Sequence, residues 1–102
     1  MDLYTFIMEY KGGTYISQVE AHNLYEARKI WAGELNTSEI QYFGPKAKTQ
    51  LIEQMNDPEN EPVELEGLTN VWCDGATING SLALINIVKT AQYTSFLGKQ
   101  DT

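Results

Sequence analysis

The side chains that could perform catalysis are few in this chain, and they are poorly suited to work together. His22 is the only histidine and Cys73 the only cysteine among 102 residues. A reactive thiolate needs a neighbouring cation or a helix N-terminus, whereas the residue after Cys73 is the acidic Asp74. His22 comes just before a predicted helix, where an imidazole commonly meets solvent. We therefore interpret both side chains as structural, and a Cys73–His22 dyad is the enzymatic alternative.

Carboxylates are plentiful, but their pattern does not indicate acid–base catalysis or metal binding. Glu64 and Glu66 are predicted on one face of a short strand, about 7 Å apart at ~3.3 Å per residue. This separation suits a glycosidase pair, yet charges on an exposed strand more often protect a sheet edge. The segment 57–61 lacks the mid-loop glycine and distal glutamate of a calcium loop. The sequence thus predicts no catalytic residue, no cofactor and no metal.

Two lysines stand where a helix disfavours them. Lys46 and Lys48 fall in the first turn of a helix predicted to begin at Pro45. Cations at a helix N-terminus oppose the helix dipole, at a cost of ~0.3–1 kcal/mol each. One explanation is an anion-binding site made by the two ammonium groups and the helix amides. The alternative is that the long lysine stems carry their charges into solvent.

The net charge of −7 belongs entirely to residues 49–88, which contain seven carboxylates and neither Lys nor Arg. Five of these carboxylates crowd a short segment that also holds two prolines. We call this set the acidic ridge; it comprises Asp57, Glu59, Glu61, Glu64 and Glu66. A basic partner would be attracted by several of these charges at once. We predict that the ridge binds a basic protein, and a purely solubilising role is the alternative, since like charges in water repel by only about 1 kcal/mol at 4 Å.

Size and composition indicate one small folded domain. We expect a single globular unit over residues 1–97 and a flexible tail over 98–102. An apolar share of 42% favours a folded core, and the single cysteine favours a reducing compartment. Neither a signal-peptide pattern nor a bilayer-spanning apolar run is visible, so we expect a cytoplasmic protein without membrane contact. The acidic total disfavours direct nucleic-acid binding, because Lys and Arg supply most of that affinity.

The N-terminal third has the clearest structural pattern. Apolar and polar residues alternate on both sides of Gly12-Gly13, which predicts an antiparallel hairpin. Centring the turn on the two glycines pairs Tyr10 with Tyr15 and places the aromatic side chains on one face. A helix follows, with Asn23 as its cap and an apolar stripe that includes Trp31.

The remaining elements complete an α+β pattern. A short strand is predicted over 39–43, and a second helix runs from Pro45 to the break at Asp57-Pro58. Further strands are predicted over 63–66, 68–74 and 82–89, the last after a turn at Asn79-Gly80. Segment 81–97 also has apolar residues at helical spacing, so a C-terminal helix is the alternative. The predicted fold is an N-terminal antiparallel hairpin, a helix, a short strand, a second helix and C-terminal antiparallel strands.

These observations favour a small, acidic, non-enzymatic protein-interaction module, of the kind represented by inhibitors, immunity proteins and antitoxins. The hairpin followed by Ala21, Asn23, Glu26 and Ala27 loosely resembles the opening of HicB-type antitoxins over about a third of the chain, without that family's proline-rich strand end.

Two other classes are the alternatives. One is a structural homo-oligomeric subunit, for instance a homodimer that contacts through Tyr42, Phe43 or the 82–89 strand. The other is a small ligand-binding domain or enzyme that uses Cys73 and His22 or the Lys46/Lys48 pair.

Overall fold

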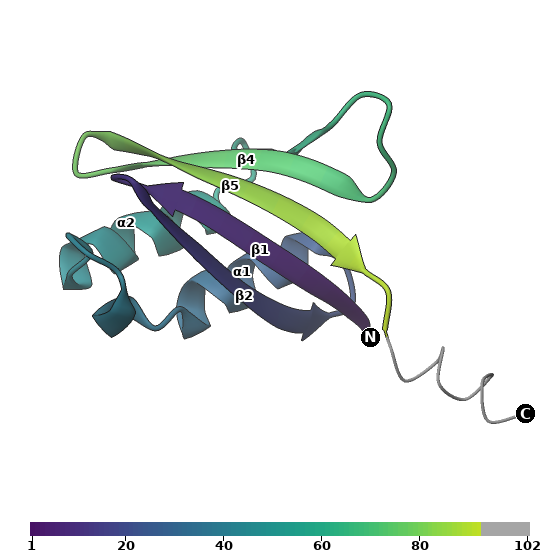
Figure 1. Cartoon of the computed structure of the whole chain (residues 1–102), viewed down its shortest axis with the longest axis horizontal. Coiled ribbons are helices and arrows are strands. Elements are labelled where there is room, and N and C mark those ends of the chain that lie inside the picture. The colour runs from purple at the N-terminus through teal and green to yellow at the C-terminus, as the bar shows by residue number, and fades with distance from the viewer. Residues whose placement is uncertain (93–102) are drawn as a thin grey trace, which may run out of the picture.

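The structure, a computed structural model, describes residues 1–92 of the chain. Five antiparallel strands form one sheet in the order β2-β1-β5-β4-β3, and two helices cover one of its faces (Figure 1). The predicted α+β fold is therefore confirmed. The elements are β1 (Asp2–Tyr10), β2 (Gly13–Ala21), α1 (Leu24–Glu34), the 3-10 helix η1 (Thr37–Glu39), α2 (Pro45–Asn56), β3 (Val63–Glu64), β4 (Val71–Ile78) and β5 (Ser81–Thr90).

The core lies between the sheet and the helix layer. Helix α1 packs against β2 and β1, and α2 packs against β4. The ring of Trp31 stacks on Phe6 with 4.7 Å between centroids. Residues at alternate positions of β1 and β5 face this core, and their neighbours in the strands form the open face of the sheet. The fully buried large side chains are Phe6, Met8, Tyr10, Trp31, Leu51, Met55, Ile78, Ile85 and Ile87.

The N-terminal hairpin forms as predicted, but its register differs by two residues. The turn is Lys11-Gly12, both with positive φ (47° and 82°), so Tyr10 pairs with Gly13 rather than with Tyr15. The predicted division of side chains between the two faces is unchanged, because a register shift of two residues keeps every side chain on the same face of the sheet. Gly13 does not have a positive φ, but a β-carbon there would contact the end of the Tyr15 ring, so a larger residue would require that ring to shift.

Helix α1 begins at its predicted cap. The Asn23 side chain accepts a hydrogen bond from the Glu26 backbone N–H (2.9 Å). The Glu26 carboxylate in turn accepts hydrogen bonds from the His22 backbone N–H and the His22 ring, both at 3.1 Å. This arrangement resembles a capping box shifted back by one residue, and it ties the residue that follows β2 to the first turn of the helix.

The short strand predicted over 39–43 does not form. Asn36 instead caps the single turn of η1, and the backbone then turns through Tyr42 at a φ of 61°. Ile40 and Phe43 are buried in the core, where Phe43 packs edge-on against Tyr10. The segment is therefore held in place by the burial of these two apolar side chains, and not by pairing with another strand. Helix α2 begins at Pro45, as predicted.

The C-terminal third is strand, and the helical alternative for 81–97 is wrong over 81–90. The turn at Asn79-Gly80, with φ angles of 50° and 79°, joins β4 to β5. Strand β5 then pairs with β1 along its other edge, so it lies at the centre of the sheet. This pairing satisfies both edges of β5 and outweighs the helical spacing of its apolar residues. Residues 93–97 and the predicted tail 98–102 lie outside the described residues.

Candidate functional site

A buried ion pair supports the segment that carries the acidic ridge. Arg28 of α1 donates from Nε to Oδ2 of Asp74 on β4, at 2.8 Å, with both side chains almost inaccessible to solvent. The same guanidinium donates from Nη2 to the backbone carbonyl of Asn60 (2.5 Å). The second Asp74 oxygen accepts from the Gly75 backbone N–H at 2.8 Å. One arginine therefore holds a helix, a strand and the ridge loop together.

Asn60 extends this network into the loop between α2 and β3. Its side-chain amide donates to the carbonyl of Gln54 (3.0 Å) and to the carbonyl of Gly75 (3.3 Å). The Asn60 backbone N–H donates to the carbonyl of Asp57, which closes a turn. The loop is thus fixed through its middle residue to both α2 and β4.

All five ridge carboxylates are exposed along the edge of the sheet that ends in β3. None of them forms an ion pair with a group in residues 1–92, although Asp57 accepts a hydrogen bond from the Glu59 backbone N–H (2.9 Å). β3 ends at Glu64, and Glu66 belongs to the following turn, where Gly67 has a φ of 81°. Glu64 and Glu66 therefore do not share a strand face, and that prediction is wrong.

Sequence reasoning missed the Arg28–Asp74 pair. The strand predicted over 68–74 ends at Asp74, whereas Asp74 is a buried residue in the middle of β4. The signal was present in the helix: Arg28 lies four residues after Leu24 and three before Trp31, inside the apolar stripe. A charged residue on a buried face requires a partner. Which carboxylate provides it depends on the packing of α1 against the sheet, which the sequence does not show.

The structure does not bring Cys73 and His22 together. His22 follows β2 and its side chain is 72% exposed, whereas Cys73 lies in β4. Two strands, β1 and β5, separate β2 from β4, which places them about 14 Å apart at the usual strand spacing. The half-buried Cys73 faces the open side of the sheet, beside Val63 and Asn86 in the neighbouring strands. The dyad alternative therefore has no support in the geometry.

The two lysines of α2 have different surroundings. Lys48 donates from Nζ to the carbonyl of Leu35 (3.2 Å), the residue that caps the C-terminus of α1. Its charge therefore opposes the dipole of its own helix but complements that of α1. Lys46 is exposed at the solvent side. The contact to Leu35 accounts for Lys48, and the anion site at Lys46 and Lys48 stays a prediction.

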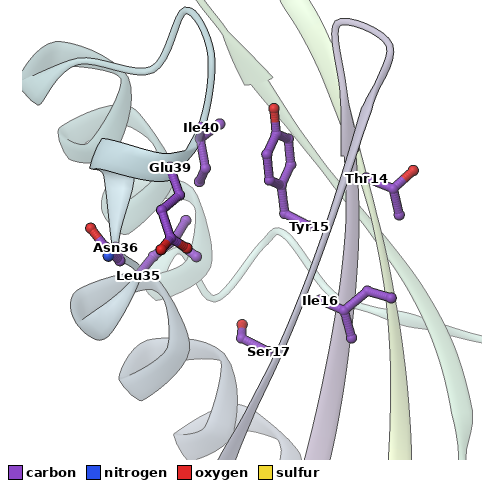
Figure 2. Close-up of a pocket in the computed structure, with 8 residues that line it drawn as sticks. All are labelled: Thr14, Tyr15, Ile16, Ser17, Leu35, Asn36, Glu39 and Ile40. Atoms are coloured by element: carbon purple, nitrogen blue, oxygen red, sulfur yellow. The ribbon is translucent and has the colours of Figure 1, made fainter.

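A second acidic surface, which sequence reasoning missed, lies at the opposite edge of the sheet. Three adjoining cavities of about 310, 240 and 610 Å³ follow β2 where it faces η1 and α1. The first and second share Ser17 and Leu35, and the second and third share Gln18 and Glu34. We call this row of three adjoining cavities the edge groove. Figure 2 shows its η1 end, with Tyr15 and Ser17 on the helix side of β2 and Thr14 and Ile16 on the other.

The charged side chains that line the edge groove are all negative. Four glutamates line it, and none of its lining residues is Lys or Arg. Glu26 is engaged by His22, whose N–H bonds lower the pKa of that carboxyl below its usual value. The other three, which form no ion pair within residues 1–92, are Glu20, Glu34 and Glu39.

Comparison with known proteins gives no relative: no family model, no curated protein and no solved structure matches this chain. Among residues 1–92, no helix is long and apolar enough to cross a membrane. The same part of the chain has no group of three or more His, Cys, Asp or Glu placed to hold a metal ion.

Proposed function

We propose that this protein is a non-enzymatic interaction module that binds a basic protein partner through the acidic ridge. The observation that carries the proposal is the exposure of five carboxylates, without a neutralising ion pair in the described chain, on a loop and strand edge. A cationic surface would meet several of them together, which mainly accelerates association and selects against acidic partners.

The hydrogen bonds that hold the ridge loop in place also support this role. A loop that only keeps a protein soluble has no need of a fixed conformation. Here the buried Arg28–Asp74 pair and the side chain of Asn60 fix the middle of the loop to the helix layer and to β4. A loop held in one conformation loses little entropy when it binds, so the same charges give more affinity.

The test is capture of partners at low salt with matched charge variants. Immobilised wild type is compared with a ridge variant that carries Glu→Gln at 59 and 61. The control carries Glu→Gln at 9 and 53, which are exposed positions outside the ridge and the edge groove, so both variants lose the same two negative charges. We expect wild type and control to retain the same basic proteins and the ridge variant to lose them. Capture of no basic protein, or equal capture by all three, would contradict the proposal.

Inhibitors, immunity proteins and antitoxins are the finer class that fits this proposal, because such proteins are small, acidic and directed at basic targets. The ridge variant separates this class from a general charge effect. A captured partner with an enzymatic activity should lose that activity when wild-type protein is added, and should keep it when the ridge variant is added.

A structural homo-oligomeric subunit is the second candidate, and the open face of the sheet favours it. Ile16, Leu82 and Val63 are each about two-thirds exposed, at 66%, 66% and 65%. Strand β5, whose 82–89 segment was predicted as a contact, contributes Leu82 to this face. Phe43 is buried and so is removed from the predicted contacts, while Tyr42 is exposed. A molecular mass in sedimentation that stays monomeric at all concentrations would exclude this candidate.

A further inference from the structure

The two edges of the sheet differ in how well they are protected. β3 is two residues long, follows Pro62 and carries Glu64, and these features discourage another strand from pairing there. β2 is nine residues long and pairs with β1 without a bulge along its whole length. It contains no proline and no lysine. By the usual rules of sheet edges, β2 is the edge open to strand addition.

The register shows which backbone groups are free on that edge. In an antiparallel ladder, hydrogen-bonded and non-hydrogen-bonded pairs alternate, and a two-residue turn is flanked by a bonded pair. Tyr10 and Gly13 flank the Lys11-Gly12 turn, so the odd-numbered residues of β2 bond to β1. No described strand lies beyond β2. The N–H and C=O groups that face outward are therefore those of Thr14, Ile16, Gln18 and Glu20.

The edge groove provides a surface against which the side chains of an added strand can pack. It follows the edge from Thr14 to Glu20, about 20 Å at the rise of a strand. A strand placed one spacing beyond β2 would direct alternate side chains toward the helix layer. There it would meet Ile30 and Leu35 together with the free carboxylates of Glu34 and Glu39.

Charge decides what kind of strand fits. Two copies of this chain joined through β2 would bring both sets of groove glutamates together with no Lys or Arg side chain between them. Like charges across an interface select against such pairing. A segment that carries Lys or Arg at alternate positions would place its cations beside the glutamates while its backbone continues the ladder. The charge of the groove therefore points to a basic partner.

We propose that the β2 edge and the edge groove form a strand-addition site for an extended, basic segment of a partner protein. The site uses other residues than the acidic ridge, at the opposite edge of the sheet. The two proposals can therefore fail separately.

The test uses a fluorescently labelled nine-residue peptide in which lysine alternates with valine and threonine. Its binding is measured by anisotropy at low salt to wild type and to an edge variant with Glu20→Gln, Glu34→Gln and Glu39→Gln. A ridge variant with Glu59→Gln, Glu61→Gln and Glu64→Gln is the matched control, because it loses the same three charges. We expect the edge variant to bind about tenfold more weakly than wild type and the ridge variant to bind within about twofold.

Two further measurements separate strand addition from attraction by charge alone. Ile16→Pro removes one outward N–H without touching the bonds to β1, and we expect it to weaken the peptide about tenfold while circular dichroism shows a folded protein. A peptide with all backbone amides methylated keeps its charges but cannot pair, and we expect at least a tenfold loss even if Ile16→Pro fails to fold. Equal binding of the methylated and unmodified peptides would overturn the proposal. So would a larger loss in the ridge variant than in the edge variant, or a dimer in sedimentation that the peptide does not dissociate.

Discussion

The Nε atom of Arg28 lies 2.8 Å from the Oδ2 atom of Asp74, and this contact joins α1 to β4 through the interior of the protein. The chain has one arginine, and it is used inside the molecule rather than on the surface. Because the guanidinium also holds the Asn60 carbonyl, the fold and the ridge loop depend on the same side chain.

We predict that Asp74→Asn destabilises the protein by about 3–5 kcal/mol, since it leaves the charge of Arg28 buried without its partner. The measurement is urea unfolding followed by tryptophan fluorescence. Asp57→Asn, a change of the same type at an exposed site, is the control and should cost less than about 1 kcal/mol. A loss below 1 kcal/mol for Asp74→Asn would contradict the assignment of a buried pair.

The double variant Arg28→Met, Asp74→Leu tests the same contact in a second way. Because both charges are removed together, we expect it to be more stable than Asp74→Asn alone. The Asn60 carbonyl loses its arginine in this variant. We therefore expect amide hydrogen exchange to become faster in residues 57–62 but not in α2, where the backbone bonds are unchanged.

Lys48→Met should destabilise the protein by ~0.3–1 kcal/mol. The lysine ammonium donates to the Leu35 carbonyl and so stabilises the partial negative charge at the C-terminus of α1. Lys46→Met is the matched control from the same turn of α2, and it should be neutral or slightly stabilising. Thermal unfolding of the two variants side by side checks the difference. Equal effects would show that the contact of Lys48 with Leu35 contributes nothing.

Glu26 makes the stability of the protein depend on acid. The backbone N–H of His22 and then its ring donate to the Glu26 carboxylate, so its folded-state pKa lies below the ordinary value of 4.5. A lowered pKa adds stability above the unfolded-state pKa, and that stability is lost as pH falls through the folded-state value. In Glu26→Gln this part of the acid dependence should disappear. The test measures the urea midpoints of wild type, Glu26→Gln and the control Glu34→Gln at neutral and at acid pH. If the midpoint of Glu26→Gln falls with pH as much as that of wild type, the prediction is wrong.

Tyr4 makes the stability of the protein depend on alkaline pH. Burial, and next the charge of Asp2, raise the pKa of its phenol above 10.0, against an opposing effect of Lys89. A raised pKa adds stability that is complete below the unfolded-state pKa and is lost as pH rises through the folded-state value. Tyr4→Phe should therefore unfold at a higher pH than wild type, measured by circular dichroism during alkaline titration. Tyr25→Phe, at an exposed tyrosine, should leave the alkaline midpoint unchanged.

Local patterns in the sequence were enough to predict most of the elements. Alternation around Lys11 to Gly13 gave the hairpin and its faces, because the period of a strand depends only on neighbouring residues. Asn23 and Pro45 gave the starts of both helices for the same local reason. The acidic ridge was visible because charge is a property of composition, and its exposure follows from the cost of burying several carboxylates.

The tertiary structure alone decided how these elements combine. Pairing of β5 with β1 puts residues 73 to 87 positions apart side by side, from Tyr10 with Ala83 to Leu3 with Thr90, and leaves β2 at an edge. No local pattern encodes that order. The partner of Arg28 and the position of Lys48 beneath α1 likewise depend on how the helices pack on the sheet. The sequence by itself determined an acidic α+β domain with an exposed charged segment. The edge groove exists only in the folded chain, because its four glutamates come from β2, α1 and η1 and meet only when α1 and η1 pack beside β2.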